Sequence, residues 1–289
     1  MNGRQPDPRV WISGRFVPEA EATVPVFDRS FLYGDGLFET IRIHHGVPFL
    51  WAPHWQRLEM GARALRIRLP HAEDEILRGV HELIRHHAVA EATLRITVSR
   101  GVGPRGYSIR GADRPVMVLT LHPAPALALE NPISWTLAVA RLRIATGDPL
   151  SRHKTSNKLL QVLAKAEAED AGADEAILLN TEGNLAEAAS GNLFWIEDGT
   201  LCTPPLDAGA LAGVTREFTL DLARSLGLRT DERTGPPERL IHAEGTFLTL
   251  STLGIVPATR LDGTRLSASP LTDRLRRAYL NAVNSLPPP

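Results

Sequence analysis

Apolar and polar residues alternate in several short runs near the start of the chain, and turn residues separate these runs. The alternation predicts strands over residues 10–17, interrupted at Ser13-Gly14, and over residues 38–44 and 48–51, joined across His45-Gly46. The beginning of the chain is therefore predicted to form short strands around tight turns.

Helical spacing of apolar residues predicts two helices after these strands. The first begins near Pro53, and the second covers residues 72–87. The apolar side of the first helix is formed by Trp55, Leu58, Ala62 and Leu65. Two apolar runs, at 94–98 and 116–121, predict further strands, so this part of the chain reads as an α+β unit.

The proline-rich segment HPAPALALENP (122–132) has little periodicity and separates two well-patterned regions. After it the pattern predicts strands at 135–139, 176–179, 193–197 and 247–250, and helices at 157–171, at 214–226 and after Pro270. We therefore expect an α+β protein with a smaller N-terminal domain (1–122), a linker (123–133) and a larger C-terminal domain (134–289).

Composition narrows the classes of function. A chain of 289 residues with 43% hydrophobic content can bury a large core, and a net charge of -1 argues against nucleic acid as a partner. The N-terminus shows no secretory signal and no run of about 18 apolar residues occurs, so we expect a cytoplasmic protein without a membrane partner. The single cysteine, Cys202, excludes an intrachain disulfide and a cysteine metal cluster, and its surroundings predict a strand.

All three lysines, Lys154, Lys158 and Lys165, lie close together, while the other basic residues are arginines. Lysine can act as an amine nucleophile because its pKa falls on burial, whereas arginine keeps its proton. Replacement of surface lysine by arginine explains the scarcity but not the position of these three. If the protein forms a Schiff base, the lysine comes from this segment.

Two motifs fail when their context is considered. Residues 101–106 (GVGPRG) match the dinucleotide-binding fingerprint, but the following YSIRGADRP has no helical periodicity. His81, Glu82 and His86 resemble a zincin helix, but the second histidine position holds Arg85. Neither a dinucleotide site nor a metal site is therefore expected.

Four separated segments suit an anionic, electron-withdrawing cofactor, although each has an ordinary alternative. Arg57 lies off the apolar side of its helix, where a solvated arginine is the alternative. The second of these segments is the one that contains the three lysines. Glu187 and Asn192 stand among small residues, where a plain turn would also fit. Gly213 precedes a helix start at Val214 and Thr215, where free N–H groups bind phosphate.

The residues of several longer segments, and their order along the chain, resemble those of a known family, the fold-type IV pyridoxal-phosphate enzymes, or class IV aminotransferases. These segments are DRSFLYGDGLFETIR (28–42), HWQRL (54–58), SRGVGPRGYS (99–108), KTSNKLLQVLAKAEA (154–168), EAASGNLFW (187–195), TPPLDAGALAGVTRE (203–217) and LSTLGIVPA (250–258). The resemblance implies the two-domain fold of D-amino acid aminotransferases, with pyridoxal 5′-phosphate as the cofactor and no metal.

The resemblance also implies roles for individual residues. Lys154 would form the Schiff base and then act as the general base, and Glu187 would face the pyridine nitrogen of the cofactor. The remaining cofactor-binding residues would be Asn192 and, around the 5′-phosphate, Arg57, Val214, Thr215, Ser251 and Thr252. The family further implies a homodimer whose active site is shared between subunits and which takes a small amino substrate.

The substrate is predicted from a loop and a few departures from related enzymes. The segment SRGVGPRGYS resembles the loop of aminodeoxychorismate lyases, in which Arg105 and Tyr107 would bind a carboxylate. Phe38, also expected at the substrate, stands where D-amino acid aminotransferases commonly have tyrosine. We therefore expect a 4-amino-4-deoxychorismate lyase of folate biosynthesis.

Three alternatives stay open. A transaminase of D-amino acids or (R)-amines is the nearest, because Arg105 also fits that class. A branched-chain aminotransferase ranks third, because Thr40 and Leu159 replace the glycine and tyrosine typical of that class. A non-catalytic binding scaffold is the last, since retention of Lys154, Glu187 and Arg57 has no purpose in it.

Overall fold

The computed structural model describes residues 8–125, 127 and 132–286. The chain divides into two compact units. The first comprises Met1–Ala124, Lys154–Asn157 and Leu286–Pro289, and the second comprises Pro125–His153 and Lys158–Ser285. The linker predicted at 123–133 contains residues 126 and 128–131, which lie outside the described residues.

The first unit is built on one six-stranded sheet with the strand order β2-β1-β6-β5-β3-β4. Its strands are β1 (Arg9–Ile12), β2 (Arg15–Pro18), β3 (Gly36–His44), β4 (Val47–Pro48), β5 (Ala92–Ser99) and β6 (Val116–His122). Its helices are η1 (Glu19–Glu21), α1 (Arg29–Tyr33), α2 (Trp51–Leu65) and α3 (Glu73–His87). All the strand pairs of this sheet are antiparallel.

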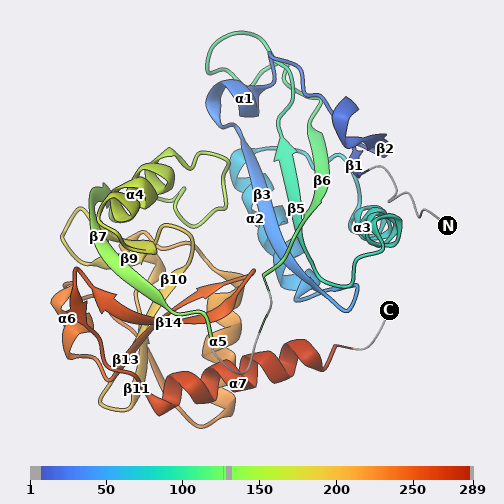
Figure 1. Cartoon of the computed structure of the whole chain (residues 1–289). Helices are drawn as coiled ribbons and strands as arrows, with labels where there is room; N and C mark the ends of the chain where they lie inside the picture. The colour runs from blue at the N-terminus through green and yellow to red at the C-terminus, as the bar shows by residue number, and fades with distance from the viewer. Residues whose placement is uncertain (1–7, 126, 128–131, 287–289) are drawn as a thin grey trace. The chain divides into compact units, whose positions relative to one another are not determined.

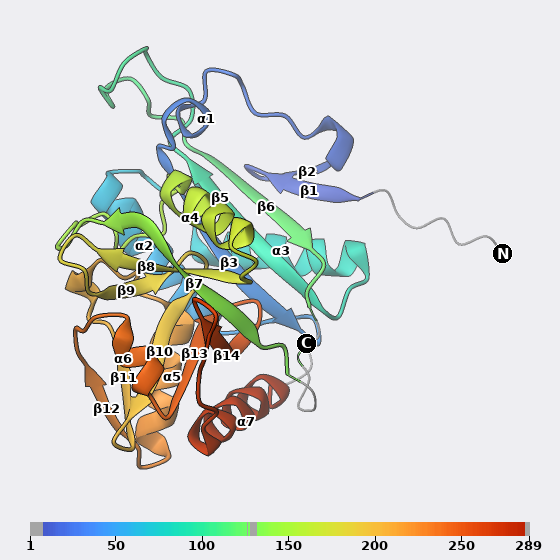
Figure 2. The same cartoon turned by 60° about the vertical axis from the view of Figure 1, so that its left-hand side comes forward.

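Helix α2 packs against β3, and α3 packs against β1 and β6 (Figure 1). Turned by 60°, the unit shows both helices behind the sheet (Figure 2). The core between helices and sheet contains Leu58 and Ala62 of α2, Ile76 of α3 and Ile41 of β3. The apolar sides predicted for both helices therefore face the sheet.

One predicted element of this unit is wrong. The strand expected at 48–51 ends at Pro48, and α2 begins at Trp51 rather than near Pro53. Leu50 adopts a left-handed backbone conformation (φ 56°) that turns the chain from the strand into the helix. The helical position of Trp51 is supported by a hydrogen bond from its indole N–H to Glu73 (2.9 Å) and by stacking on Trp55 (5.9 Å between ring centroids).

The second unit contains a nine-stranded sheet with the strand order β12-β11-β10-β13-β14-β7-β8-β9, and β15 pairs with β14. Its strands are β7 (Trp135–Ile144), β8 (Glu175–Asn180), β9 (Leu185–Ala188), β10 (Asn192–Glu197), β11 (Thr200–Thr203), β12 (Arg229–Glu232), β13 (Gly245–Leu250), β14 (Gly254–Leu261) and β15 (Thr264–Arg265). Its helices are α4 (Leu159–Asp170), η2 (Leu206–Ala208), α5 (Val214–Ser225), α6 (Glu238–His242) and α7 (Pro270–Asn284).

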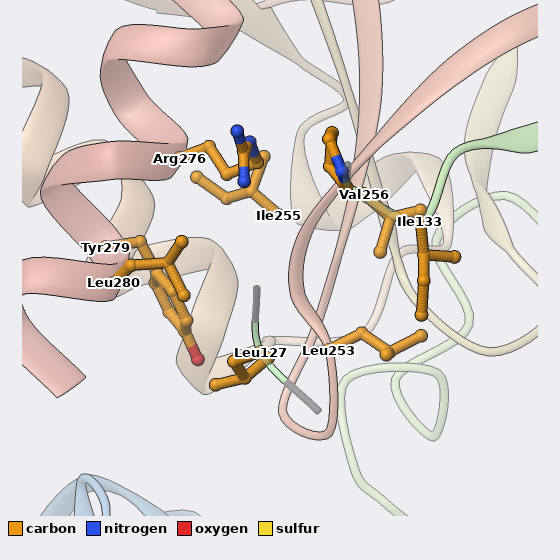
Figure 3. A pocket seen from close by; sticks show the side chains of 9 residues that line it. Leu127, Ile133, Leu253, Ile255, Val256, Arg276, Tyr279 and Leu280 are labelled. Carbon is orange, nitrogen blue, oxygen red and sulfur yellow. The ribbon is translucent and has the colours of Figure 1, made fainter. Parts of the chain in front are cut away.

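Strand β8 is buried along its whole length, which is typical of a strand covered on both faces. Ala176 and Leu178 belong to a cluster with Ala164 and Ala168 of α4. Ile177 and Leu179, which alternate with them, belong to the opposite cluster. Helix α7 packs on β13 and β14, and its Tyr279 and Leu280 line a small apolar pocket with residues near the start of β14 (Figure 3).

Several details of the second unit follow from local signals in the sequence. Asp198 and Gly199 make the turn after β10, both with positive φ (49° and 63°). Pro270 begins α7, where the missing N–H of proline is harmless. Cys202 lies fully buried in β11 as a free thiol. Among the described residues, no helix combines the length and the apolar character needed to cross a membrane.

Candidate functional site

The residues predicted to bind cofactor and substrate divide between the two units. Those of the first unit are Phe38, Arg57, Arg105, Tyr107 and Lys154. Those of the second unit are Glu187, Asn192, Val214, Thr215, Ser251 and Thr252. Each set is described within its own unit.

Lys154 is held by the backbone of strand β3. The N–H of Phe38 donates to the carbonyl oxygen of Lys154 (3.0 Å), and the N–H of Ser156 donates to that of Gly36 (2.9 Å). The segment thus adds an isolated bridge, between Leu37 and Thr155, to the edge of β3. Because this pairing occupies residues 154–156, α4 begins at Leu159 and not at the predicted residue 157.

Two cations lie close to the Phe38 ring. The Nζ atom of Lys154 is 4.6 Å from the ring centroid, and the guanidinium carbon of Arg95 is 4.1 Å from it. Arg95 is half-buried, donates to the hydroxyl of Thr97 (3.2 Å), and has its pKa lowered by burial. A cation over the face of an aromatic ring is attracted by its quadrupole. Arg95 is therefore a candidate carboxylate-binding group that the sequence reasoning missed.

Arg57 is not the solvated helix arginine that stood as its alternative interpretation. Only 6% of its surface is exposed, and its guanidinium forms two hydrogen bonds of 2.7 Å with the carboxylate of Glu39. His54, one turn earlier in α2, contacts the same carboxylate. The sequence did contain a signal for this cluster. Glu39 lies two residues from both Leu37 and Ile41, so all three side chains point to the same buried face of β3.

The loop at residues 99–108 is anchored at its base by buried ion pairs. Arg29 donates to the carboxylate of Asp35 (2.8 Å) and to the carbonyl oxygen of Gly106 (2.9 Å). Arg100 donates to both oxygens of Asp35 (2.8 and 2.9 Å). Burial on its own raises the pKa of Asp35, but the hydrogen bonds and charges of these two arginines outweigh it and lower the pKa. The base is thus a fixed, charge-paired structure.

The tip of this loop presents the two predicted substrate residues to solvent. Arg105 is exposed, and Tyr107 is 87% exposed. The backbone beside them is ordered by Tyr33, whose hydroxyl accepts a hydrogen bond from the Gly106 N–H (3.1 Å) and whose ring meets that of Tyr107 edge to face (5.6 Å between centroids). Both residues are therefore held in place while their side chains remain accessible.

In the second unit, one loop connects the two predicted residues of the segment EAASGN. The N–H of Leu211 donates to the carboxylate of Glu187 (2.8 Å), and the side-chain amide of Asn192 donates to the carbonyl oxygen of Leu211 (2.9 Å). Glu187 and Asn192 are both buried, at 7% and 5% exposure. The role of Leu211 could not be read from the sequence, because its backbone and not its side chain makes these contacts.

The start of helix α5 has the features of an anion-binding site. No side chain caps this helix, whose N-cap is Gly213. The Thr215 hydroxyl lies 3.4 Å from that of Ser251, which comes from the turn that also contains Thr252. A Cβ atom on Gly213 would lie 1.9 Å from the Asn192 side-chain oxygen, so only glycine allows this close approach. The N–H groups, the helix dipole and these hydroxyls suit a phosphate.

Comparison with known proteins supports one family. The sequence pattern of the amino-transferase class IV family matches residues 36–261. A Methanocaldococcus jannaschii protein provisionally named a branched-chain-amino-acid aminotransferase is 36% identical over 88% of this chain and 88% of its own length. The aminodeoxychorismate lyase of Bacillus subtilis is 31% identical over 88% of this chain and 86% of its own length.

A solved structure agrees with these sequence relatives. The branched-chain amino acid aminotransferase of Thermobaculum terrenum, in its PLP-bound form, superposes with a TM-score of 0.87 and 27% identity, over 97% of this chain and 95% of that chain. Fold, sequence pattern and sequence identity thus point the same way. The chain belongs to the class IV aminotransferase family and is an enzyme dependent on pyridoxal 5′-phosphate.

Proposed function

We propose that this enzyme is a 4-amino-4-deoxychorismate lyase, which forms 4-aminobenzoate and pyruvate. The observation that carries the proposal is the loop at 99–108, whose anchored base presents Arg105 and Tyr107. An arginine and a phenol suit a carboxylate of the anionic substrate from which the aromatic product forms. The 31% identity to an aminodeoxychorismate lyase supports the same choice.

The residues of both units fit the cofactor. We propose that Lys154 attaches it covalently through its ε-amine, and that Arg57, Thr215 and Ser251 hold its phosphate together with the N–H groups of α5. The 3.4 Å approach of the Thr215 and Ser251 hydroxyls and the uncapped helix start support the phosphate assignment. Glu187, whose carboxylate accepts a hydrogen bond from the Leu211 N–H, would face the pyridine nitrogen and favour its protonated form.

Each of these residues then has a task in the reaction. When bound, pyridoxal 5′-phosphate supplies an electron-withdrawing ring that stabilises negative charge at the substrate Cα. The ε-amine of Lys154, in its neutral form, would act as the general base that accepts the proton from the substrate Cα and holds it for return to the product. Asn192 keeps the Leu211 peptide in place, and this peptide orients the Glu187 carboxylate.

We further propose a homodimer in which Arg105 and Tyr107 act in the site of the partner subunit. Large apolar side chains are exposed in two neighbouring stretches of the first unit. They are Val24, Val26, Phe27, Phe31, Leu32, Val102, Tyr107 and Ile109. An exposed apolar surface of this kind is typical of a protein interface, and it carries the loop that would reach the partner.

A second candidate is a transaminase, and Arg95 is the observation that favours it. Its half-buried cation lies over Phe38, near Lys154, where it would meet the second carboxylate of a 2-oxo diacid acceptor. A lyase needs no such acceptor. The 36% identity to the archaeal protein provisionally named a branched-chain aminotransferase supports this candidate.

The test compares both reactions on the purified enzyme. We expect 4-aminobenzoate from 4-amino-4-deoxychorismate without an acceptor, and loss of turnover in Lys154→Ala. Arg105→Ala should lower kcat/KM about tenfold or more, since a charged hydrogen bond is removed. Arg110→Ala, an exposed arginine of the same stretch, is the matched control. Rapid glutamate formation from branched-chain or D-amino acids with 2-oxoglutarate, and no 4-aminobenzoate, would refute the lyase proposal.

Mixing two impaired variants tests the shared site. A dimer of one Lys154→Ala chain and one Arg105→Ala chain has one intact site if the loop acts in the partner. We expect activity to return after the two variants are mixed under conditions that exchange subunits. A mixture no more active than expected from its two parents would show that the loop serves its own chain.

A further inference from the structure

A buried cluster of three polar side chains lies between strand β3 and helix α2. Glu39, His54 and Arg57 are exposed by only 1%, 2% and 6%. Charged groups are almost never buried this deeply unless they are paired, because removal from water disfavours the charged form. The assignment of Arg57 to a phosphate does not by itself explain why its own counter-ion and a histidine are buried with it.

The geometry fixes the direction of the arginine. Nε of Arg57 donates to Oε1 of Glu39 and Nη2 donates to Oε2, both at 2.7 Å. Such a two-point pairing, through Nε and Nη2, holds the guanidinium plane. His54 places Nδ1 2.7 Å from Oε2 of the same carboxylate. Because an ionised carboxylate only accepts hydrogen bonds, Nδ1 of His54 carries the proton.

The charges of the cluster follow from its surroundings. Burial on its own raises the pKa of Glu39, but the charge of Arg57, the charge that His54 carries in acid, and the hydrogen bonds of both residues outweigh it and lower the pKa to about 2. For His54, burial lowers the pKa more than Glu39 raises it, and the charges of Arg57 and Lys154 lower it further. At neutral pH the cluster thus contains one carboxylate, one guanidinium and a neutral imidazole.

The packing of α2 on β3 places the three groups together. A Cβ atom on Gly61, one turn after Arg57, would lie 2.9 Å from a methyl carbon of Leu37. Glycine therefore allows a close approach of the helix to the strand at this point. Leu37 and Glu39 lie on the same face of β3, so this approach brings the Glu39 carboxylate within reach of α2.

We propose that Glu39 is the positioning residue for Arg57, and that His54 completes the hydrogen bonding of the Glu39 carboxylate. This inference rests on the proposed function, in which Arg57 binds the phosphate of the cofactor. A guanidinium that is already held in place loses little freedom when it binds a phosphate ester, so its affinity for that group is higher. Glu39 itself touches neither cofactor nor substrate in this role.

The experiment measures the affinity of the apo-enzyme for two probes, pyridoxal 5′-phosphate and pyridoxal, which lacks the phosphate. In Glu39→Gln an amide replaces one oxygen that accepts from Arg57 or His54. We expect the Kd for pyridoxal 5′-phosphate to rise about 10- to 100-fold, as for loss of a charge-assisted hydrogen bond, and the Kd for pyridoxal to stay the same. A merely structural role would weaken the binding of both probes equally.

Matched variants serve as controls and as a second route. Glu91→Gln removes the counter-ion of another buried arginine of β3, Arg42 (2.5 Å), and should leave both Kd values unchanged. Glu39→Asp keeps the charge but withdraws it by one methylene, so we expect a smaller loss that is again confined to the phosphate-bearing probe. This variant tests the inference even if Glu39→Gln fails to fold.

Arg57→Ala separates this inference from the proposed function. If Arg57→Ala leaves the ratio of the two Kd values unchanged, Arg57 does not bind the phosphate and the proposed site is wrong. If Arg57→Ala changes the ratio but neither Glu39 variant does, the positioning role alone is wrong. In support of the role, adding Glu39→Gln to Arg57→Ala should cause no further change in the ratio.

Discussion

Replacement of Gly254 by alanine should destabilise the second unit through two separable effects. Gly254 begins β14 directly after the turn that carries Ser251 and Thr252, and it has a φ of +69°. Alanine in this left-handed region costs about 1 kcal/mol. Its Cβ atom would also lie 2.3 Å from a ring carbon of Tyr279, which is 1% exposed in the core. Overpacking of this kind costs about 1–3 kcal/mol, so we expect a total loss of about 2–4 kcal/mol.

Gly172 supplies a matched control in the same unit. It has nearly the same backbone conformation, with a φ of +72°, but no atom lies within 4 Å of a Cβ built there. Gly172→Ala should therefore lower the free energy of unfolding only by the cost of placing alanine in a left-handed conformation, about 1 kcal/mol. Urea unfolding of the apo-enzyme, followed by circular dichroism, gives both losses from the transition midpoints if the slopes stay equal.

A double variant tests the contact itself. Tyr279→Leu removes the ring that the new methyl group would meet, and Tyr279 and Leu280 both project from α7 (Figure 3). In the Tyr279→Leu background, Gly254→Ala should therefore cost no more than Gly172→Ala does. Equal losses for Gly254→Ala and Gly172→Ala in the wild-type background would refute the reasoning, because the contact with Tyr279 would then contribute nothing.

Three further predictions follow from the structure. The pKa of Glu39 falls from 4.5 to about 2 on folding, so its ionised carboxylate stabilises the fold by about 3 kcal/mol above pH 4.5, and this stabilisation is lost as the pH falls towards 2. The free energy of urea unfolding should therefore depend more steeply on pH in wild type than in Glu39→Gln. Parallel curves for the two proteins would contradict this prediction. Burial raises the pKa of Cys202 to about 11, so this thiol should react with maleimide at neutral pH only after the protein unfolds. Mass spectrometry measures the labelling, and rapid labelling of the native enzyme would show that the thiol is accessible. Gly213→Ala should displace the Asn192 side chain, because the new Cβ atom would lie 1.9 Å from the Asn192 side-chain oxygen. We expect the Kd for pyridoxal 5′-phosphate, measured by equilibrium dialysis, to rise about tenfold. An unchanged Kd would mean that the close approach of Gly213 to Asn192 is not needed for binding.

Local signals in the sequence predicted most elements of both units. Periodicity located α3, which begins one residue after its predicted start, and glycine or proline marked the turn at Ser13-Gly14 and the start of α7 at Pro270. These signals work because they depend only on neighbouring residues along the chain. The strand expected at 48–51 failed because a short apolar run fits either a strand or the first turn of a helix.

The family could be recognised from the sequence alone, and the lysine, the glutamate and the glycine before α5 could be proposed for the chemistry because they stand in recognisable segments. The contacts that hold these residues are visible only in the folded structure. Arg57 reads as a solvated helix residue until Glu39, eighteen positions earlier, is found against it. Lys154 is held by pairing with β3, more than a hundred residues away, and Glu187 by the peptide of Leu211. A linear pattern records which side of an element is apolar, whereas the partner of a buried charge depends on packing between distant segments.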